Sequence, residues 1–541
     1  MFLRLIIAKV FVIAVLASGC LSVSNRCLPG DLCFPANIVW IKFMETLDGN
    51  LYFPHTREYD HLVMQRNSIY TKFPFAIVEV KNTADVQKSV LFARKHNLLV
   101  SIKTSGHDFI GRSTAHGSLQ IFLGSMNATK IHLFSIRNPA GEITCESGNT
   151  WLKVYEEVDR HNRTIVGGSG HTVSVAGYTL GGGHSPMSRM FGLAVDNLLE
   201  IEMVTAEGHV VVANKFMTQT SFVNGTFATS NDTDIFWASR GGGGGTFGIV
   251  TKFTFKLHYP APQIVQFLCS YPIQKANGQK YGFTVLKKIF SMLTSLPKEW
   301  GGYLLISGVP DKSGNFGNVM LAMNHHGPFH SATRAYLDQL KNFQQDWQSF
   351  CFYKNFSSYY DYDKTSKETS YFPYYSSNTL LHNHNFTDDL ISFILQKVKT
   401  GYSNSSHMGM TGTFLGGEVK TIEHHENAVN PALRSSLMSL TATTYLPTTD
   451  LNYSAFLVRG EEIGKELNKF GLGQYVNNAG NDVISWQKEF WGNNYRRLLK
   501  IKKKWDPDNF FTCKECVGSE EIGPNFVDGV FHIPIGPPFG K

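Results

Sequence analysis

The stretch Lys103-Thr-Ser-Gly-His107-Asp-Phe-Ile-Gly111 follows directly on the apolar run 98–103 (LLVSIK), which predicts a buried strand. Upstream, 75–80 (FAIVEV) predicts another strand, and Thr83 is expected to cap a helix with apolar residues at helical spacing. Strand, helix and strand in this order are typical of the start of an α/β domain. The small residues after the second strand leave backbone N–H groups free to bind a pyrophosphate.

Glycine is concentrated in two further stretches, 167–183 (GGSGHTVSVAGYTLGGG) and 241–245. Both lie between apolar, strand-like segments, so we expect close approach of the backbone to a ligand rather than a flexible linker. Residues 243–248 (GGGTFG) match the pattern G-x-G-x-x-G, but the alternating segment 249–257 predicts a strand immediately afterwards. Rossmann-type dinucleotide binding requires a helix at that point, so we reject it.

Other segments extend this pattern along the chain. Trp151, Val154, Tyr155 and Val158 predict one face of a helix, and 198–213 predicts a hairpin. Beyond residue 261, strand-like and helical stretches alternate with polar and aromatic loops. The tyrosine-rich run 359–375 could line a substrate site, although a surface loop is the favoured interpretation.

The composition is that of a globular protein, because 42% of the 541 residues are hydrophobic and 17% are charged. This length predicts two or more packed units. The formal net charge of +7 is dispersed, which argues against nucleic acid as a partner. The basic run 500–504 (KIKKK) is interpreted as a solvated helix face.

The N-terminus has the layout of a signal peptide, with Arg4 and Lys9 before the apolar run 10–17 and small residues after it. We expect cleavage near Gly19 and a secreted protein without a membrane anchor; a signal anchor is the alternative. Sequons for N-glycosylation occur at Asn127, Asn162, Asn224, Asn231, Asn355, Asn385, Asn404 and Asn452.

Two cysteine pairs are close enough in sequence to form local disulfides, Cys27 with Cys33 and Cys513 with Cys516. The second pair could instead be redox-active or form half of a zinc site. No second ligand pair of zinc spacing accompanies it, so we expect no metal.

The blocks 103–113, 167–197 and 234–248, followed by the C-terminal motifs 475–478 (YVNN), 491–495 (WGNNY) and 502–510 (KKKWDPDNF), occur in a characteristic order. In this order they resemble the FAD-linked oxidoreductases of the vanillyl-alcohol-oxidase superfamily, in the berberine-bridge-enzyme-like branch. The resemblance covers about 73–260 and 473–517.

The resemblance implies an α+β fold: a two-lobed PCMH-type FAD-binding domain, made of two α/β subdomains, plus an α/β substrate domain with an antiparallel sheet. It divides the chain into a signal peptide (1–19), an N-terminal segment (20–72), an FAD-binding domain (73–260), a substrate domain (261–465) and a C-terminal segment that completes the FAD lobe (466–541).

The resemblance also implies roles for individual residues. His107 matches the histidine that is bonded covalently to the 8α-methyl carbon of FAD. Gly170 stands where bicovalent members carry a cysteine, and Cys145 is not placed to replace it, so no cysteinyl link is expected. Val173 matches a position that influences oxygen access and favours an oxidase. Tyr178 stands where plant members often have a histidine, which leaves the contacts to the pyrimidine side of the flavin open.

The expected cofactor-binding residues are Lys103, Thr104, Ser105, Gly106, His107, Asp108, Gly168, Gly170, Val173, Gly177, Gly181, Gly182, Gly183, Asp196, Val250 and Asn477.

The catalytic base is the position at which the sequence departs from the plant members. Those members use a glutamate on a strand of the substrate domain, but the corresponding stretch 437–441 (LMSLT) contains no carboxylate. The candidates that the chain offers for this role are Tyr475, Glu418, His424 and His425.

The resulting hypothesis is a secreted, monomeric FAD-dependent oxidase. It passes hydride from an alcohol, a sugar or a related metabolite to flavin N5, and the electrons then reduce dioxygen to hydrogen peroxide. The alternatives are an oxidative cyclase or desaturase of secondary metabolism, and a secreted flavin-binding glycoprotein that has lost turnover.

Overall fold

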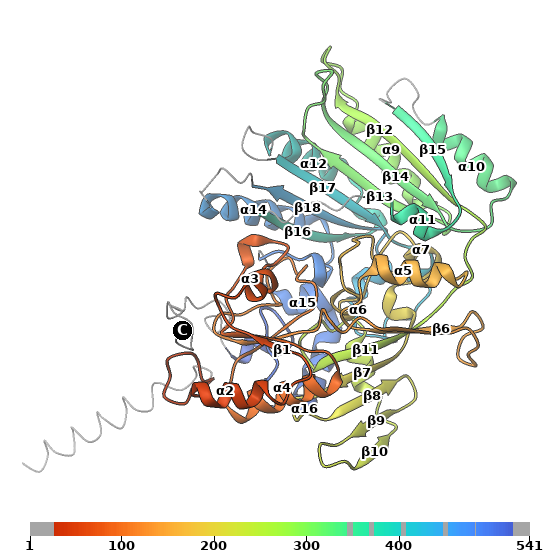
Figure 1. Ribbon diagram of the computed structural model, residues 1–541. Coiled ribbons are helices and arrows are strands. Elements are labelled where there is room, and N and C mark those ends of the chain that lie inside the picture. Colours follow the sequence, from red (N-terminus) through yellow and green to blue (C-terminus); the bar gives the residue numbers. More distant parts are fainter. Residues whose placement is uncertain are drawn as a thin grey trace, which may run out of the picture.

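The computed structural model describes residues 26–342, 350–366, 373–401, 407–446, 453–481 and 483–522, which form two lobes (Figure 1). The predicted signal peptide and the sequons at Asn404 and Asn452 lie outside the described residues. Within the described part, no helix has both the length and the apolar character needed to cross a bilayer. The fold is of the α+β class.

The first sheet of the lower lobe in Figure 1 contains the two strands of the predicted strand–helix–strand unit, β2 and β3. Its strands are β1 (Asn50–Tyr52), β2 (Ala76–Glu79), β3 (Val100–Lys103) and β4 (Leu119–Phe122), in the order β1-β2-β4-β3. Strands β2 and β3 are both parallel to β4. Helix α4 (Thr83–Lys95) buries Val86 and Val90, but the N-cap is Asn82, whose side chain accepts a hydrogen bond from the Asp85 N–H. The prediction that Thr83 caps this helix is therefore wrong, because its hydroxyl donates to Glu202 instead.

The second sheet of this lobe is antiparallel throughout and contains the predicted hairpin. Its strands run in the order β10-β9-β8-β7-β11-β6-β5. Their bounds are β5 (Thr129–His132), β6 (Glu142–Glu146), β7 (Leu198–Val204), β8 (Val210–Asn214), β9 (Thr218–Ser221), β10 (Phe227–Ser230) and β11 (Ile249–Lys256). Helix α5 (Trp151–Arg160) buries the four apolar residues that predicted it.

The upper lobe in Figure 1 is built on one antiparallel sheet with the strand order β15-β12-β14-β13-β17-β18-β16. The bounds are β12 (Ile264–Gln274), β13 (Trp300–Ser307), β14 (Phe316–His325), β15 (Phe350–Phe356), β16 (Tyr374–Leu381), β17 (His407–Phe414) and β18 (Met438–Tyr445). Helices that pack on it include α9 (Gly282–Thr294), α12 (Asp388–Thr400) and α14 (Tyr453–Leu467). Leu304 and Met410 belong to the core formed with these helices, so the alternate residues of β13 and β17 face the other way.

Two buried arginines join the lobes. Arg189 in α7 (Ser188–Phe191) donates to the carbonyls of Trp300, Leu296 and Leu415. Arg434 in α13 (Pro431–Ser435) forms two hydrogen bonds of 2.7 Å with the Asp196 carboxylate. Both guanidinium groups are almost fully buried, so they fix the arrangement of the lobes through directed bonds.

Three tyrosines of the tyrosine-rich run are buried instead of lying in the expected surface loop. Tyr359 opens α11 (Tyr359–Asp363), is buried, and lies edge-on to Tyr155 with 5.0 Å between ring centroids. Tyr374 and Tyr375 are buried as well. The favoured interpretation is therefore wrong for these three tyrosines, whereas residues 364–366 are exposed, as a surface loop requires.

Both local disulfides that the sequence predicts, Cys27–Cys33 and Cys513–Cys516, are present. A third, Cys269–Cys351, joins the adjacent strands β12 and β15. Cys145 is free and fully buried, and desolvation raises the pKa of its thiol. It is therefore a core residue rather than a reactive group.

Candidate cofactor and substrate site

A cavity of about 400 Å³ lies where the two lobes meet. The histidine loop after β3, both glycine-rich stretches and the C-terminal segment all contribute to its lining, together with β13 and β17 of the substrate sheet. The described lining residues include Thr104, Ser105, Gly106, His107, Asp108, Gly168, Gly170, Val173, Gly177, Gly244, Gly245, Val250, Tyr303, Thr411, Thr413, Tyr475 and Asn477. Segments far apart in the sequence are thus brought to one site.

The His107 ring is held by a hydroxyl group at each nitrogen. Its Nδ1 lies 3.0 Å from Ser105 Oγ, and its Nε2 lies 3.0 Å from Thr172 Oγ1. The Ser174 N–H donates to Ser105 Oγ at 3.1 Å, and the Ser174 and Thr104 hydroxyl oxygens are 2.6 Å apart. The loop after β3 and the first glycine-rich stretch are therefore in direct contact.

Two glycines of the cavity wall, Gly177 and Gly245, leave space that a side chain would fill. A Cβ on Gly177 would meet no protein atom within 4 Å, and the nearest atom to one on Gly245 would be 3.9 Å away. Gly245 also has a φ of +71°, a conformation that side chains rarely adopt. Strand β11 follows this turn directly, in agreement with the rejection of a Rossmann motif. The exposed backbone suits the phosphates and ribose of FAD.

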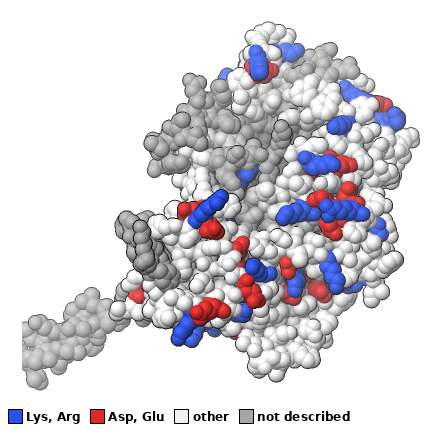
Figure 2. All heavy atoms as spheres, in the orientation of Figure 1, with Lys and Arg blue, Asp and Glu red and all other residues white. Residues whose placement is uncertain are grey.

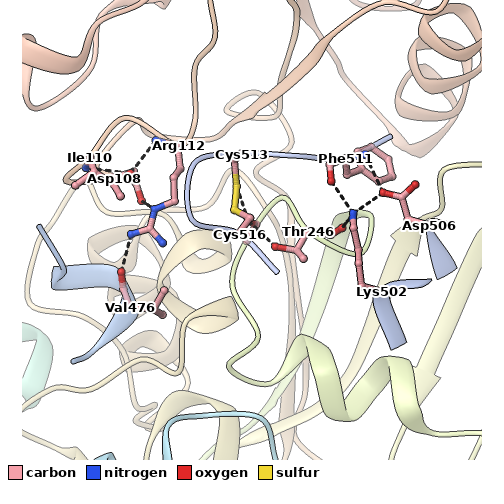
Figure 3. Close-up of a disulfide and its surroundings, with 11 residues drawn as sticks. Asp108, Ile110, Arg112, Thr246, Val476, Lys502, Asp506, Phe511, Cys513 and Cys516 are labelled. Carbon is pink, nitrogen blue, oxygen red and sulfur yellow. Dashed lines mark hydrogen bonds and ion pairs between the residues drawn. A yellow bond between two sulfur atoms is a disulfide. The ribbon is translucent and has the colours of Figure 1, made fainter. Parts of the chain in front are cut away.

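Asp108 lies on the wall of the cavity, but its carboxylate is already paired (Figure 3). It lies 3.1 Å from the Arg112 guanidinium and accepts the backbone N–H groups of Ile110 and Arg112. Arg112 in turn donates to the carbonyl of Val476 at 2.6 Å. This pair links the histidine loop to the C-terminal segment without leaving a net charge in the cavity.

Phe511, Thr512 and Cys513 of the C-terminal segment also line the cavity, and Figure 3 shows Phe511 and Cys513 with the residues around them. Lys502, in α16 (Tyr495–Trp505), donates to Asp506 and to the carbonyls of Thr246 and Phe511 at 2.5–2.7 Å. It is almost fully buried, so the interpretation of 500–504 as a solvated face is wrong at this position. The Cys513–Cys516 disulfide packs beside the carbonyl of Gly244. The C-terminal segment is thereby fixed against the second glycine-rich turn.

Tyr475 lines the cavity, and its hydroxyl group accepts hydrogen bonds from two neighbours. The Gly183 N–H donates to its Oη at 3.0 Å, and Asn477 Nδ2 donates at 3.1 Å. Burial raises the pKa of Tyr475 to about 12, although these hydrogen bonds act in the opposite direction. The His184 ring lies against it, with 4.3 Å between the centroids.

The substrate sheet contributes further neutral hydroxyl groups, from Tyr303, Thr411 and Thr413. Tyr303 and Thr413 are register partners on β13 and β17, and Tyr303 Oη lies 2.6 Å from Ser169 Oγ. Burial raises the pKa of Tyr303. Burial also lowers the pKa of His184 to about 4, so this imidazole is neutral at neutral pH.

The family assignment follows from comparison with known proteins. Residues 74–214 match the FAD binding domain family, and residues 474–517 match the berberine and berberine-like family. The FAD-linked oxidoreductase easE of Arthroderma benhamiae is 30% identical, over 83% of this chain and 90% of its own. The chain belongs to the FAD-linked oxidoreductases. The VAO-type flavoprotein oxidase VAO615 of Thermothelomyces thermophilus is 27% identical, over 92% of this chain and 94% of its own.

Solved structures share the fold of this FAD-linked oxidoreductase. The VAO-type flavoprotein MtVAO615 from Myceliophthora thermophila C1 has a TM-score of 0.75 and 24% identity, over 92% of this chain and 97% of its own. A glucooligosaccharide oxidase from Acremonium strictum has a TM-score of 0.73 and 20% identity, over 89% and 98% of the two chains.

Several residues that the sequence places in the FAD shell of this oxidoreductase do not line the cavity. Lys103 points away from it, with Nζ 2.5 Å from the carbonyls of Leu62 and Met64, and burial lowers its pKa to about 7. Asp196 is bound by Arg434 instead. Gly181, Gly182 and Gly183 lie behind the lining, where a Cβ on Gly181 would be 2.3 Å from the Asn477 side chain. They support the wall rather than forming it.

The remaining base candidates of the oxidoreductase lie elsewhere. Glu418 contacts Lys298 at 3.4 Å and Thr421, outside the cavity lining. His424 and His425 are exposed. Of the four candidates that the sequence offered, only Tyr475 lines the cavity. Tyr303, Thr411 and Thr413 were not found from the sequence, although the alternation of β17 places both threonines on one face.

Proposed function

We propose that this protein is an oxidase that removes hydride from a neutral alcohol or sugar, with Tyr475 as the catalytic base and dioxygen as the electron acceptor. The observation that carries the proposal is Tyr475, which lines the cavity and whose Oη has hydrogen-bond donors at 3.0 and 3.1 Å. Hydrogen bonds to an oxygen stabilise its deprotonated form, which is the form that takes a proton from a substrate hydroxyl.

FAD supplies the redox chemistry in this family, accepting a hydride and passing the electrons on. The chain would hold it with the backbone of 104–108, 168–177 and 244–250, and would tether it through His107. The Acremonium strictum enzyme is described as carrying a 6-S-cysteinyl, 8α-N1-histidyl FAD. Here Gly170 stands where we expect that cysteine, so a single histidyl link is proposed.

A neutral substrate fits the charges of the cavity. Asp108 and Arg112 are the charged residues among its described lining, and they pair with each other. His184 is neutral because its pKa is lowered to about 4 by burial. A buried ammonium or carboxylate without a partner costs several kcal/mol. The site therefore favours hydroxyl compounds over the amines that an alkaloid cyclase would process.

The oxidase assignment also depends on access of dioxygen to the reactive edge of the flavin. Val173 lines the cavity on the segment that carries Thr172, where the family position affects this access. A small apolar side chain at that point leaves room for oxygen to approach. We therefore propose hydrogen peroxide as the second product.

We further propose that the enzyme is secreted as a monomeric glycoprotein. Disulfides are typical of oxidising compartments, and the chain contains Cys27–Cys33, Cys269–Cys351 and Cys513–Cys516. The exposed sequon asparagines are Asn127, Asn162, Asn224, Asn231 and Asn355. Positive and negative side chains are intermixed on the face shown in Figure 2, which supports a small-molecule substrate rather than a polyanionic partner.

The experiment that tests the function uses the purified secreted protein. Neutral sugars and alcohols should release hydrogen peroxide, whereas amines and carboxylates of matched size should not. Release with amines alone would favour the oxidative cyclase or desaturase, and no reduction of the flavin by any compound would favour a protein that has lost turnover. Acid precipitation should leave the flavin in the pellet, and the His107→Ala variant should leave it in the supernatant.

A further inference from the structure

The side chains that line the cavity show which face of the substrate sheet is turned toward it. Tyr303 on β13 and Thr411 and Thr413 on β17 line the cavity. Leu304 and Met410 on the same strands belong to the core with the helices. Successive side chains of a strand point to opposite faces, and register partners on neighbouring strands share a face. The strand register therefore identifies the other residues of the cavity face.

A row of apolar side chains continues from Tyr303 across the sheet to its edge at β15. Tyr303 is the register partner of Ala322 on β14. Ala322 is paired with Leu268 on β12, and Leu268 with Phe352 on β15. The four strands are neighbours in this order in the upper lobe (Figure 1). Because adjacent strands lie about 4.8 Å apart, about 14 Å separates the backbone at Phe352 from that at Tyr303.

A second row crosses the same strands two residues further along each of them. Leu305 on β13 is paired with Met320 on β14, Met320 with Ser270, and Ser270 with Phe350. Ser270 is buried, whereas Leu305 and Met320 are half-buried and Phe350 is exposed. Phe350 and Phe352 are stacked at the sheet edge, with 6.1 Å between their ring centroids. Both rows therefore end in an exposed aromatic pair.

Polar residues lie on both sides of these two rows. Asn324, Gln266 and Lys354 are register partners in the next row on one side. Ser307 and Asn318 are paired on the other side. The apolar surface is thus a stripe two side chains wide that leads from the cavity to β15. We call it the apolar stripe and define it by Leu305, Met320, Ala322, Leu268, Phe350 and Phe352.

The apolar stripe is not part of the packed interior among the residues that the structure describes. Its four aliphatic members are half-buried, its two phenylalanines are exposed, and none of the six belongs to a hydrophobic core cluster or packs against one there. Single exposed apolar residues are ordinary, but a contiguous apolar patch with a polar border is typical of a binding surface.

We propose that the apolar stripe binds the hydrocarbon tail of the substrate, so that the preferred substrate is a long-chain alcohol rather than a free sugar. This inference rests on the proposed function and deepens it by naming the substrate class. The occupant follows from the continuity of the stripe with the cavity, because Leu305 is the register partner of the cavity residue Thr411. The hydroxyl end lies in the cavity, and the tail runs past Tyr303 toward Phe352.

A sugar chain fits the same surface poorly. Its ring hydroxyl groups exchange hydrogen bonds with water for hydrogen bonds with the protein, and a hydroxyl group that finds no partner opposes binding. Leucine, alanine, methionine and phenylalanine side chains offer no strong donor or acceptor. A hydrocarbon tail needs none, and it gains from every part of the stripe that it covers.

The expected gain can be estimated for each methylene group of the tail. Full burial of a methylene group increases affinity about fourfold, so burial on one side should increase it about twofold. The gain should end where the sheet ends, about 14 Å beyond Tyr303. A purely structural role of the stripe residues would give no dependence on chain length.

The experiment measures kcat/KM of the holoenzyme for straight-chain primary alcohols from propanol to decanol. In the wild type the value should rise about twofold for each added methylene group. Leu268→Gln, in the middle of the stripe, should lower the ratio of decanol to propanol about tenfold, and Phe352→Gln, at its end, about threefold. Because each ratio is taken within one variant, a partly unfolded preparation does not change it.

Tyr353→Gln is the matched control for Phe352→Gln. Tyr353 is the next residue of β15 and is 48% exposed, compared with 46% for Phe352. It points to the opposite face of the sheet, where Lys341 Nζ of α10 (Ser331–Lys341) lies 3.8 Å from its ring centroid. This variant should keep the wild-type dependence on chain length.

Tertiary alcohols with the same tails separate the inference from the proposed function, because their carbinol carbon carries no hydrogen to transfer. Calorimetry with the holoenzyme should show about twofold tighter binding for each added methylene group. If primary alcohols are not oxidised but the tertiary series shows this profile, the proposed function fails and the apolar stripe stands. A flat profile in both series, or the wild-type profile in Leu268→Gln, overturns the inference, and oxidation of free sugars with a flat profile would leave the proposed function intact.

Discussion

Replacement of Tyr475 by phenylalanine tests the proposed base, and the structure limits how much else the substitution disturbs. The ring and its contact with His184 stay, and the Oη atom is lost. Asn477 Nδ2 keeps its hydrogen bonds to the carbonyl oxygens of Gly177, at 3.0 Å, and Tyr178, at 3.2 Å. The backbone N–H groups of Gly183 and His184 lose this acceptor, and each loss costs about 1–3 kcal/mol. A domain of ordinary stability tolerates that loss.

Catalysis should suffer far more than stability in this variant. A positioned general base contributes roughly 10²–10⁴-fold, so kcat should fall by about that factor while FAD remains bound. The assay is anaerobic mixing with saturating substrate, followed by the loss of the absorbance of the oxidised flavin. Thermal unfolding of the same samples measures the stability, and Glu418→Gln, outside the cavity, is the control expected to keep the wild-type rate.

The pH dependence gives an independent check of the same residue. The base must be deprotonated to accept a proton, and burial holds the pKa of Tyr475 at about 12. The wild-type kcat/KM should therefore rise with pH through the neutral and alkaline range, because the reactive fraction grows. The Tyr475→Phe variant should lose this rise. A variant that reduces the flavin at the wild-type rate, or keeps the wild-type pH profile, would refute the assignment.

Two further predictions concern stability and secretion. Arg434→Met leaves the buried Asp196 carboxylate without its cation, and the unfolding free energy should fall by about 3–5 kcal/mol; an unchanged denaturation midpoint would contradict this. Asn224 should carry a glycan because it is exposed and its Oδ1 accepts from Thr226, whereas the half-buried Asn385 should not. Glycopeptide mapping of the secreted protein would show the reverse pattern if this reasoning is wrong.

The parts of the fold that could be predicted from sequence are those with a local signal. The α4 and α5 helices follow from apolar residues at helical spacing, and the hairpin β7–β8 from two apolar runs around a turn. The Cys27–Cys33 disulfide follows from closeness along the chain. The contact between the histidine loop and the first glycine-rich stretch could be predicted only from the order of whole motifs, and not from any single residue.

The parts that could not be predicted depend on strand register. Cys269 and Cys351 are 82 residues apart, and only the pairing of β12 with β15 sets them opposite each other. Tyr303 and Thr413 share a face of the cavity for the same reason. The role of Asp196 was misjudged because its arginine partner comes from the other lobe, 238 residues away. Long-range pairing of this kind leaves no periodic trace in the sequence.

The continuous segment 172–183 contacts both His107, the proposed attachment point of FAD, and Tyr475, the proposed base. At its start Thr172 contacts the His107 ring, and at its end the Gly183 N–H donates to Tyr475 Oη. Between them α6 (Val175–Leu180) is anchored by buried apolar residues and by the Asn477 bonds to its carbonyls. The separation between tether and base is therefore set by a short, packed helix rather than by the relative placement of the lobes. Movement of the substrate sheet would then change the substrate contacts at Tyr303 and leave the distance between His107 and Tyr475 unchanged.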